Sequence, residues 1–543
     1  MHSKPHNISI TQCIQLIVQN KQIGILYKNC IANLVFIIVQ NMLTIGQTNS
    51  KINCRKYTKE GRMERISYNK VTNDIVELLK KACNGHVLTG DQINDDFCHD
   101  EMKIYGTAMP DVVVEAETTE EVSAVMKICN ENKIPVTPSG ARTDLAGGPV
   151  AKYGGVILST IKMNKILSYD VDNLVVTIQP GVLLNDLAQD ALSKGLMYPP
   201  DPGEKFATVG GNVSTNAGGM RAVKYGTTRD YVRAMTVVLP TGEVVHEGAT
   251  VSKCSSGYGI KDIMIGSEGT LGIITELTLK LIVAPKATMS MIVPFPTLEE
   301  AISSVPKLFA AHLNPQALEF MEKDVVIDTE KLLGKEVYPK ELDGVDINAY
   351  VLVTFDGNDQ DELMDTIEAA SEVVLEAGAV DVLVADTPQQ LRDAWAIRSS
   401  LLESIEGNTK LLDECDVVVP ITKIPEFLTY AKSLQEGHSY TIKDFGHAGD
   451  GNLHIYLCSN DDDKEAFMKE SDDFMKKVYI KAVELGGLIS GEHGIGSGKM
   501  DYLKDFVGPV NMRLMRGIKK VFDPNMILNP GKVCFDPEES YAD

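Results

Sequence analysis

The chain has 543 residues, of which 44% are hydrophobic and 23% charged, and its formal net charge is -23 at pH 7. This composition is typical of a soluble globular protein with two or three domains. The acidic balance argues against a nucleic-acid partner, because phosphate binding needs clustered Lys and Arg side chains. No uninterrupted apolar run of about 18 residues is present, so no transmembrane segment is predicted.

The beginning of the chain differs from the rest in charge. Residues 1–62 hold eight Lys or Arg and one acid, a net charge of +7, whereas residues 63–543 hold 44 bases and 74 acids, a net charge of -30. The codons for residues 59–62 can contain a bacterial ribosome-binding sequence directly before Met63. We therefore expect residues 1–62 to be a non-native upstream extension, with a signal anchor at the apolar residues 31–39 as the alternative.

Ten cysteines are spread along the chain without any Cys-x-x-Cys pair. This usage disfavours an iron–sulfur cluster or a zinc ribbon on the same chain. It is typical of a reducing compartment, and we expect a cytoplasmic location.

Hydrophobic periodicity predicts a short N-terminal helical segment over residues 63–106 and an α+β domain over residues 107–285. The first helix is expected over residues 70–82. A β-α-β unit follows, with a strand over residues 111–115, a helix capped by Thr119 and a strand beginning at Ile134. Further strands are expected over residues 155–158, 174–178, 234–239 and 273–281.

After Pro285 the pattern changes to strands that each precede a helix. It predicts a second domain over residues 286–535 and a tail over residues 536–543. Strands are expected over residues 290–294, 349–355 and 453–458, and helices over residues 298–308, 361–376 and 463–485. Units of this kind predict an antiparallel sheet covered on one face by helices, and an α+β fold for the whole chain.

Three stretches of the first domain are rich in glycine and small polar residues, namely residues 139–148, 208–219 and 266–274. Such stretches expose backbone N–H groups and can cradle a diphosphate. A tight turn is the alternative for any one of them. No GxGxxG between a strand and a helix and no P-loop is present, which disfavours a Rossmann-type NAD site.

These stretches, with Gln179-Pro180-Gly181-Val182 and Pro200-Asp201-Pro202-Gly203, resemble the FAD domain of the vanillyl-alcohol-oxidase/PCMH flavoprotein superfamily. Within it, the sequence resembles the FAD-linked glycolate and D-lactate dehydrogenase branch over residues 100–535. The resemblance implies a PCMH-type two-part FAD-binding domain followed by a cap domain. It implies FAD contacts by Pro138, Ser139, Gly140, Ala141, Arg142, Thr143, Asp144, Pro180, Gly181, Pro200, Asp201, Thr208, Gly210, Gly211, Asn212, Ser214, Thr215, Gly269, Gly272, Ile273, Ile274 and Asn529.

The first glycine-rich stretch departs from the pattern of this branch in two places. The branch usually has Arg where Ser139 stands and Gly where Arg142 stands, which suggests that a positive charge has moved by three residues. No His or Cys stands in this stretch, where relatives with covalent flavin attach it. We therefore expect the FAD to be bound non-covalently.

Three histidines lie in glycine-studded parts of the second domain. His447 and His454 flank a turn rich in Gly, Asp and Asn, so the two imidazoles can converge at one end of a hairpin. A second segment, residues 490–496, adds Glu492 and His493 between glycines. Two imidazoles and one carboxylate leave open positions on a divalent ion, whereas hydrogen bonding alone is the alternative for the histidine pair.

The same dehydrogenase branch has equivalent segments, and the resemblance assigns roles to them. It implies that His447, His454 and Glu492 bind a divalent Zn, Fe or Mn ion and that His493 is the general base. It also implies that Arg398, in Trp395-Ala396-Ile397-Arg398, binds the substrate carboxylate, unless Arg398 is a solvated helix residue. Glu414 and Asp416 are weaker candidates for contacts behind the metal ligands, with a solvated strand end as the alternative.

The implied function is the FAD-dependent oxidation of a small 2-hydroxy acid, lactate or glycolate, to the 2-oxo acid. A divalent ion lowers the pKa of the hydroxyl group, and an imidazole with a pKa of about 6.5 can then accept the proton. An electron-transfer flavoprotein or an iron–sulfur subunit is the expected acceptor of the electrons. The alternatives are a 2-hydroxyglutarate-type dehydrogenase and a flavin-carrying electron-transfer subunit whose histidines are structural.

Overall fold

The computed structural model describes residues 62–63, 65–84, 86–539 and 541–542. The predicted upstream extension therefore lies outside the described residues, apart from Arg62. Strands β1 (Arg62–Met63) and β22 (Tyr541–Ala542) pair with each other in one unit of the chain. All other described elements belong to a second unit, Ile66–Glu539.

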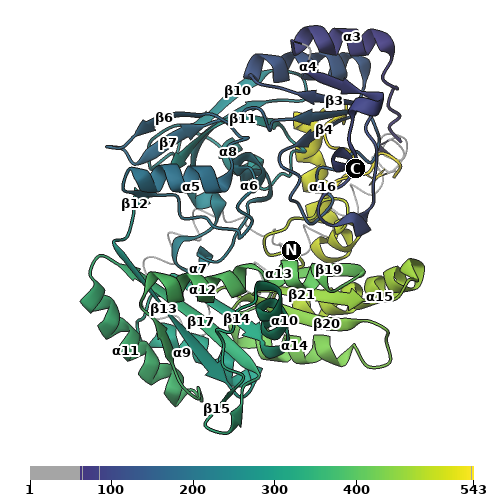
Figure 1. Ribbon diagram of the computed structural model, residues 1–543. Helices are drawn as coiled ribbons and strands as arrows, with labels where there is room; N and C mark the ends of the chain where they lie inside the picture. The colour runs from purple at the N-terminus through teal and green to yellow at the C-terminus, as the bar shows by residue number, and fades with distance from the viewer. Residues whose placement is uncertain (1–61, 64, 85, 540, 543) are drawn as a thin grey trace, which may run out of the picture. The chain divides into compact units, whose positions relative to one another are not determined.

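A four-stranded sheet with the order β2-β3-β5-β4 opens the second unit (Figure 1). Strands β3 and β4 both run parallel to β5, which lies between them, so the predicted β-α-β unit is present with one strand inserted. Helix α4 begins after Thr118, whose side chain accepts the Glu121 N–H, and not after Thr119 as predicted. The elements are α3 (Asn73–Ala82), β2 (Val87–Thr89), β3 (Val112–Glu115), α4 (Thr119–Asn132), β4 (Val136–Ser139) and β5 (Val156–Ser159).

A five-stranded antiparallel sheet with the order β10-β9-β11-β7-β6 follows along the chain. Its core includes Val176, Val237, Leu277 and Leu279, which are fully buried. The strand expected over residues 273–281 is therefore present as β11. The elements are β6 (Ile166–Asp170), β7 (Val175–Ile178), α5 (Leu184–Ser193), β8 (Leu196–Met197), α6 (Val209–Thr215), α7 (Ala222–Tyr225), β9 (Val232–Val238), β10 (Val244–Gly248), α8 (Ile260–Met264), β11 (Ile273–Lys280) and β12 (Ile282–Val283).

The second half of this unit is built on a seven-stranded antiparallel sheet, here named the cap sheet, with the order β18-β13-β17-β14-β20-β21-β19. The interior strand β17 is buried at successive residues, because helices cover both faces of the sheet here and not one face as predicted. The strands are β13 (Ala287–Phe295), β14 (Ala317–Glu322), β17 (Ala349–Gly357), β18 (Leu383–Ala385), β19 (Leu411–Val418), β20 (Thr441–His447) and β21 (Asn452–Ser459). A separate hairpin joins β15 (Glu341–Leu342) to β16 (Val345–Asp346).

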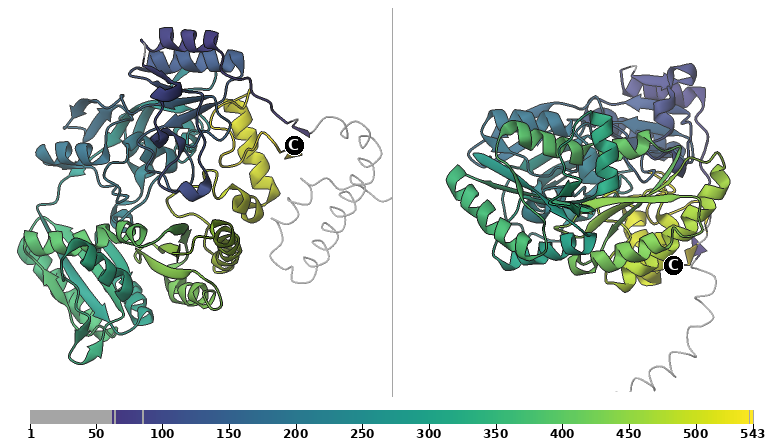
Figure 2. Two further views of the ribbon diagram at one scale, coloured as in Figure 1. Left: turned by 45° about the vertical axis from the view of Figure 1, so that its right-hand side comes forward. Right: turned by 60° about the horizontal axis from the view of Figure 1, so that its bottom comes forward.

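The helices of this half follow the predicted strand-then-helix order. Helices α10, α12 and α13 share a hydrophobic core with the side chains of one face of the cap sheet. Figure 2 shows the helices lying along the sheet. The helices are α9 (Leu298–Ala310), α10 (Lys323–Leu333), α11 (Gln360–Glu376), α12 (Pro388–Ser399), α13 (Leu401–Gly407), α14 (Ile424–Ser433), α15 (Lys464–Glu484) and α16 (Met500–Phe522).

The C-terminal segment returns from the cap to the first sheet. Helix α16 bends at Gly508, which has a φ of 75° and precedes Pro509. After the helix, the Val136 N–H of β4 donates to the Ile527 carbonyl, and the Asn529 N–H donates to the Val136 carbonyl. This pairing places α16 beside β4 in Figures 1 and 2 and brings Asn529 next to the glycine-rich loops.

The side chain of Lys519 fixes this return. Its Nζ donates to Asp523 Oδ2 at 2.6 Å, to the Leu528 carbonyl at 2.7 Å and to the Thr270 carbonyl at 2.8 Å. Both charged side chains are at most 2% exposed. One buried ammonium group thus joins α16, the C-terminal segment and the third glycine-rich stretch.

We expect Lys519→Met to lower the free energy of unfolding by about 3–5 kcal/mol, because Asp523 then remains as a buried charge without its counter-ion. Urea unfolding followed by circular dichroism measures the change. Lys520→Met is the matched control, since Lys520 is the exposed neighbour on the same helix. Equal loss of stability in the two variants would contradict the role assigned to Lys519.

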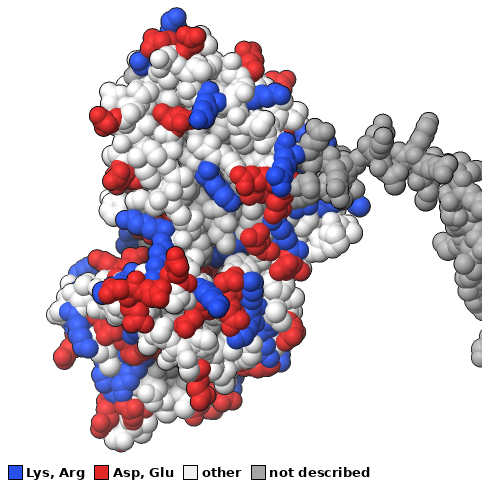
Figure 3. All heavy atoms as spheres, turned by 90° about the vertical axis from the view of Figure 1, so that its right-hand side faces the viewer, with Lys and Arg blue, Asp and Glu red and all other residues white. Residues whose placement is uncertain are grey.

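The described surface carries charges of both signs. On the face in Figure 3, Lys and Arg side chains lie between Asp and Glu side chains, most densely over the lower part. The seven cysteines at positions 83, 98, 129, 254, 415, 458 and 534 are all unpaired. Among the described residues, no helix has the length and apolar character needed to cross a bilayer.

Candidate active site

A large pocket lies where the glycine-rich loops meet the C-terminal segment and residues 492–493 of the cap half. It encloses about 1190 Å³ of empty space, counting the part that is open to solvent. The predicted cofactor residues that line it are Pro138, Ser139, Gly140, Ala141, Arg142, Thr143, Asp144, Pro180, Thr208, Gly210, Gly211, Asn212, Ser214, Thr215, Gly269, Gly272, Ile273, Ile274 and Asn529.

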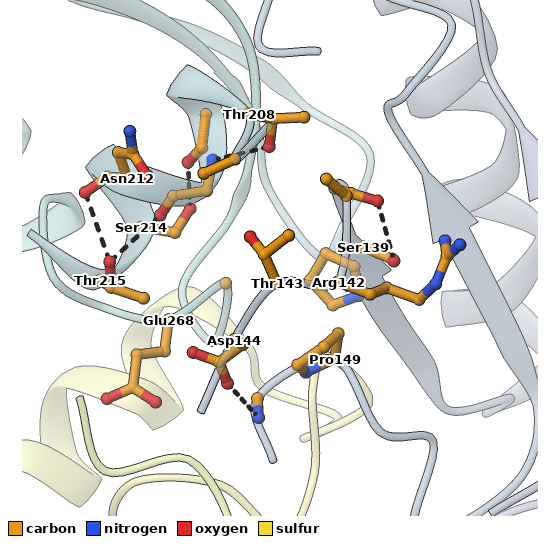
Figure 4. A pocket seen from close by; sticks show the side chains of 18 of the residues that line it. Ser139, Arg142, Thr143, Asp144, Pro149, Thr208, Asn212, Ser214, Thr215 and Glu268 are labelled. Atoms are coloured by element: carbon orange, nitrogen blue, oxygen red, sulfur yellow. Dashed lines mark hydrogen bonds between the residues drawn. The ribbon is translucent and has the colours of Figure 1, made fainter. Parts of the chain in front are cut away.

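The loops approach one another closely because they lack side chains. A Cβ atom on Gly140 would lie 2.3 Å from Thr208 Oγ1, and a Cβ atom on Gly210 would lie 2.5 Å from Pro180 Cβ. Thr208 also caps α6 by accepting the Gly211 N–H. Figure 4 shows the polar side chains of α6 on one side of the pocket and Asp144 and Glu268 on another. The backbone cradle fits the FAD that the sequence implies.

Three predicted cofactor residues do not line the pocket. Gly181 packs against carbonyl oxygens, since a Cβ atom there would lie 2.4 Å from the Thr160 oxygen. Asp201 forms an ion pair with Arg221, 3.2 Å away, and a bridge with Gly219, and Pro200 precedes it. These residues support the loops from behind, so a direct contact with the cofactor stays a prediction for them.

The pocket also has lining residues that were not predicted from the sequence. They are Leu145, Gly148, Pro149, Thr160, Pro202, Glu204, Ala207, Ala217 and Glu268.

Arg142 lies in the pocket wall with an unusual backbone conformation. Its φ is 65°, a left-handed value that suits glycine better than arginine. Its guanidinium carbon lies 4.3 Å from the centre of the Phe97 ring. In Figure 4 the side chain extends away from Thr208 and Asn212. The predicted phosphate contact of Arg142 stays a prediction.

The predicted metal ligands come together through the register of the cap sheet. His447 lies opposite Asn452 in the β20–β21 pair, so His454, two residues further, has its side chain on the same face. Neighbouring strands add Glu319 opposite His447 and Asp416 opposite His454. One face of the cap sheet therefore gathers imidazoles and carboxylates at a single place.

Glu492 lies between the two imidazoles. Its Oε1 is 3.2 Å from His447 Nε2 and 3.3 Å from His454 Nε2. Its Oε2 is buried and has no hydrogen-bond partner in the described part of the chain. Burial raises the pKa of Glu492, but hydrogen bonds and charges from both histidines outweigh burial and hold the pKa below its usual value. Two imidazole nitrogens and a carboxylate converging in this way can hold a divalent cation.

Two further carboxylates lie behind the imidazoles. Both oxygens of Glu319 are 2.9 Å from His447 Nδ1. Glu414 Oε2 is 2.9 Å from His493 Nδ1, and its Oε1 is 3.4 Å from His454 Nδ1. Burial alone would lower the pKa of His447, but the Glu319 carboxylate outweighs burial and raises it well above its usual value.

Asp416 shapes the loop that carries Glu492 and His493. Its Oδ2 accepts the N–H groups of Gly491, Glu492 and His493 at 2.9–3.1 Å. The side chain is fully buried, as is that of Glu414 at 1% exposure. The alternative of a solvated strand end is therefore wrong for both residues, and both contact the histidine cluster.

His493 lines the pocket with Glu492. Its ring stacks on that of His454 with the ring centres 5.1 Å apart. Burial lowers the pKa of His493, but the Glu414 and Asp416 carboxylates outweigh burial and raise the pKa to about 9. The pKa of about 6.5 that the sequence analysis assumed for His493 is therefore too low for the site as described. A further positive charge beside His493 would lower its pKa again.

Arg398 lies on α12, beside the histidine cluster. It is 4% exposed and does not line the pocket. Its Nε donates to Glu319 Oε2 at 2.8 Å, so the guanidinium lies behind His447. The alternative of a solvated helix residue is therefore wrong, and the contact of Arg398 with the substrate carboxylate stays a prediction.

Glu268 is a pocket residue that sequence reasoning missed. It accepts the N–H groups of Ile495 and Gly496 and thereby joins the third glycine-rich stretch to the histidine loop. Burial raises the pKa of Glu268 to about 7, despite the two backbone hydrogen bonds that lower it. The sequence signal that could have identified Glu268 is a charged residue inside a glycine-rich stretch.

This raised pKa predicts a pH-dependent stability. The folded state binds the proton more tightly than the unfolded state, so stability falls as the pH rises from about 4.5 towards 7. Relative to Glu268→Gln, the wild-type free energy of unfolding is expected to fall by roughly 3 kcal/mol over this range. Urea unfolding at a series of pH values measures this change, with Glu77→Gln on exposed α3 as the control. A difference between wild type and Glu268→Gln that does not change with pH would contradict the assignment.

Comparisons with known proteins agree with these observations. Residues 110–248 match the family model described as FAD binding domain, and residues 284–533 match the model described as FAD linked oxidases, C-terminal domain. A D-lactate dehydrogenase of Anaerostipes hadrus is 68% identical over 87% of this chain and all of its own length. A D-lactate dehydrogenase of Archaeoglobus fulgidus is 40% identical over 78% of this chain and 91% of its own. The glycolate oxidase subunit GlcD of Bacillus subtilis is 36% identical over 78% and 89%.

Solved structures support the fold. 4-Ethylphenol oxidase from Gulosibacter chungangensis superposes with a TM-score of 0.70 at 18% identity, over 87% of this chain and 99% of that one. p-Cresol methylhydroxylase superposes with a TM-score of 0.69 at 18% identity, over 86% and 98%. The predicted α+β, PCMH-type architecture is thus confirmed. The chain belongs to the family of FAD-linked oxidases that includes D-lactate dehydrogenases and glycolate oxidase subunits, and it is an FAD-dependent oxidoreductase.

Proposed function

We propose that this protein oxidises D-lactate to the 2-oxo acid. It is an FAD-dependent hydroxy-acid oxidoreductase, in which FAD, when bound, accepts the hydride that leaves the substrate Cα. The observation that carries the proposal is that Glu492 and His493 of the cap half line the same pocket as the cofactor loops. The two D-lactate dehydrogenases among the relatives support lactate as the substrate.

His493 is the proposed general base. Its Nδ1–H donates to Glu414, which leaves Nε2 to accept the proton of the substrate hydroxyl group. The neutral imidazole is needed for this step. A divalent ion bound by the adjacent His454 would lower the pKa of His493 by charge repulsion and so favour the neutral form.

A divalent Zn, Fe or Mn ion is proposed at His447, His454 and Glu492. When bound, such an ion polarises the substrate hydroxyl group and lowers its pKa. Four buried carboxylates contact the histidines or their loop, namely Glu319, Glu414, Asp416 and Glu492. These acidic surroundings support a cation at the site.

A substrate with two carboxylates fits the pocket less well. Among the described residues that line it, Arg142 is the only Lys or Arg, and its guanidinium lies over Phe97. A second carboxylate, as in 2-hydroxyglutarate, therefore lacks a cationic partner. This supports a small monocarboxylate.

A separate electron acceptor, such as an electron-transfer flavoprotein or an iron–sulfur subunit, is part of the proposal. The lack of any Cys-x-x-Cys pair in the sequence supports a partner chain for this step. A cytoplasmic location is proposed from the unpaired cysteines. We also propose that residues 107–285 bind the flavin and residues 286–535 bind the substrate.

Anaerobic titration of the FAD-loaded protein tests the proposal. D-lactate, L-lactate, glycolate and D-2-hydroxyglutarate are added in turn while the visible absorbance of oxidised flavin is followed. D-lactate is expected to bleach the flavin fastest. Unchanged absorbance with every hydroxy acid would contradict the proposal and favour an electron-transfer subunit.

A further inference from the structure

Residues 217–228 form a closed loop that follows α6 in the half of the chain proposed to bind the flavin, here named the flavin half. The ends of the loop meet, because the Ala217 carbonyl accepts the backbone N–H and the hydroxyl group of Thr228 at 3.1 and 2.8 Å. Compact loops whose ends lie close together are frequently functional. Figure 1 shows α7, which lies within this loop, where the flavin half meets the cap half.

A buried carboxylate of the cap sheet binds this loop. The side chain of Asp356, on β17, is 1% exposed. It accepts hydrogen bonds from the Lys224 ammonium group, from the Tyr225 hydroxyl group at 2.6 Å and from the Gln316 amide at 2.8 Å. Two of these three donors lie on α7, so Asp356 joins the loop of the flavin half to the cap half.

The same loop contacts the parts of the cap half that carry the candidate catalytic groups. A Cβ atom on Gly449, in the turn between β20 and β21, would lie 2.7 Å from Val223 Cγ2. A Cβ atom on Gly218 would lie 3.1 Å from Glu492 Oε2. Ala217, the neighbour of Gly218, lines the pocket. The loop therefore contacts both the pocket and the histidine cluster.

We propose that Asp356 is a positioning residue, which holds loop 217–228 in place through α7 and thereby sets how the histidine cluster lies over the flavin. This inference rests on the proposed oxidation of a hydroxy acid in the pocket. It gives Asp356 no contact with the substrate, the flavin or a metal ion.

The placement of one half against the other matters for the reaction. Glu492 and His493 come from the cap half, whereas the glycine-rich loops of the pocket come from the flavin half. Hydride transfer needs reacting atoms that are aligned and about 3–3.5 Å apart, and an error of about 1 Å can cost roughly 10²-fold in rate. A residue that fixes the contact between the halves can therefore control the rate without touching the reactants.

The loop adds to the contact that Glu268 makes with the histidine cluster. Glu268 of the flavin half binds the segment after His493 by accepting the N–H groups of Ile495 and Gly496. A single contact leaves one body free to rotate about it. The second contact, of α7 with the turn at Gly449, removes that freedom, and Asp356 maintains it.

Flavin reduction in FAD-loaded variants tests the inference. Asp356→Asn is expected to lower the maximal rate of reduction by D-lactate about 10–100-fold, with FAD retained and little change in the D-lactate concentration that gives half this rate. Tyr225→Phe removes one donor and is expected to lower the rate about 2–5-fold. Reduction by dithionite needs no group of the cap half, so it is expected to keep the wild-type rate. Anaerobic stopped-flow absorbance measures both reactions.

Glu330→Gln is the matched control. Glu330 is also a buried carboxylate of the cap half, where it accepts hydrogen bonds from Lys340 and from the N–H groups of Val337 and Tyr338. These partners all lie within the cap half. The variant is therefore expected to keep the wild-type rate of reduction by D-lactate.

Two further variants make the same comparison from the loop, should Asp356→Asn fail to fold. Lys224→Met removes the ion pair with Asp356 and is expected to lower the rate of reduction by D-lactate about tenfold. Lys224→Arg retains the positive charge and is expected to restore most of this loss.

Three results would overturn the inference and leave the proposed function standing. They are a wild-type rate with D-lactate in Asp356→Asn and in Lys224→Met, an equal loss in Asp356→Asn and Glu330→Gln, and a matching loss with dithionite, which would place the defect in the flavin site itself. A wild-type protein whose flavin is reduced by dithionite but by no hydroxy acid would instead overturn the proposed function.

Discussion

Replacing His493 by alanine is expected to slow flavin reduction by D-lactate about 10²–10⁴-fold, the contribution of a well-placed general base. Bound FAD is expected to remain, because the loops that form most of the pocket are unchanged. Anaerobic stopped-flow absorbance measures the rate of reduction, and the flavin-to-protein ratio measures FAD retention.

His438→Ala is the matched control for this experiment. His438 lies on the cap half, where its ring stacks on Tyr440 and its side chain is 30% exposed. It is expected to reduce flavin at the wild-type rate. A normal rate in His493→Ala would remove His493 from the base role, whereas equal losses in both variants would point to a general effect on the cap.

Glu492→Gln is expected to lower kcat/KM for D-lactate about 10²–10³-fold. The charged oxygen that both imidazoles face is lost, and a bound divalent ion supplies several kcal/mol of transition-state stabilisation, each 1.4 kcal/mol being tenfold in rate. Steady-state kinetics and metal analysis of the same samples measure the two losses together. Chelated wild-type protein is expected to show the same defect and to recover when metal is added back.

The control for the metal experiment is Glu484→Gln, at the exposed end of α15. It is expected to retain wild-type metal content and kcat/KM. Wild-type metal content and activity in Glu492→Gln would show that Glu492 is not a ligand. Activity that survives complete chelation of the wild-type protein would show that the reaction needs no divalent ion.

The convergence of His447 and His454 was predictable because it is local. A short turn joins two strands, and the two-residue period of a strand then places both imidazoles on one face. The close approach of the glycine-rich loops was equally predictable, because it excludes side chains at positions such as Gly140 and Gly210. Both inferences depend on residues that are near one another in sequence.

The contacts behind the histidines were not predictable from the sequence. Glu319 reaches His447 because β14 pairs with β20, a neighbour more than a hundred residues away, and the order of strands in the cap sheet has no local signature. The available signal was a glutamate between the apolar residues Leu318 and Phe320 of β14, since a fully buried glutamate is rare unless it is paired. The contact of Arg398 with Glu319 was not predicted for the same reason, because the two residues lie on different elements.

A crystal structure of the protein with FAD and Mn²⁺ bound, with anomalous scattering data, tests most directly whether the cap half holds a metal ion at the flavin. The expected result is an anomalous peak within coordination distance of His447 Nε2, His454 Nε2 and Glu492, in the pocket that holds the flavin ring. For a zinc-loaded crystal, the metal–nitrogen and metal–oxygen distances should be about 2.0–2.2 Å. A peak elsewhere, with the two histidines and Glu492 still hydrogen-bonded to one another, would contradict the proposed metal centre.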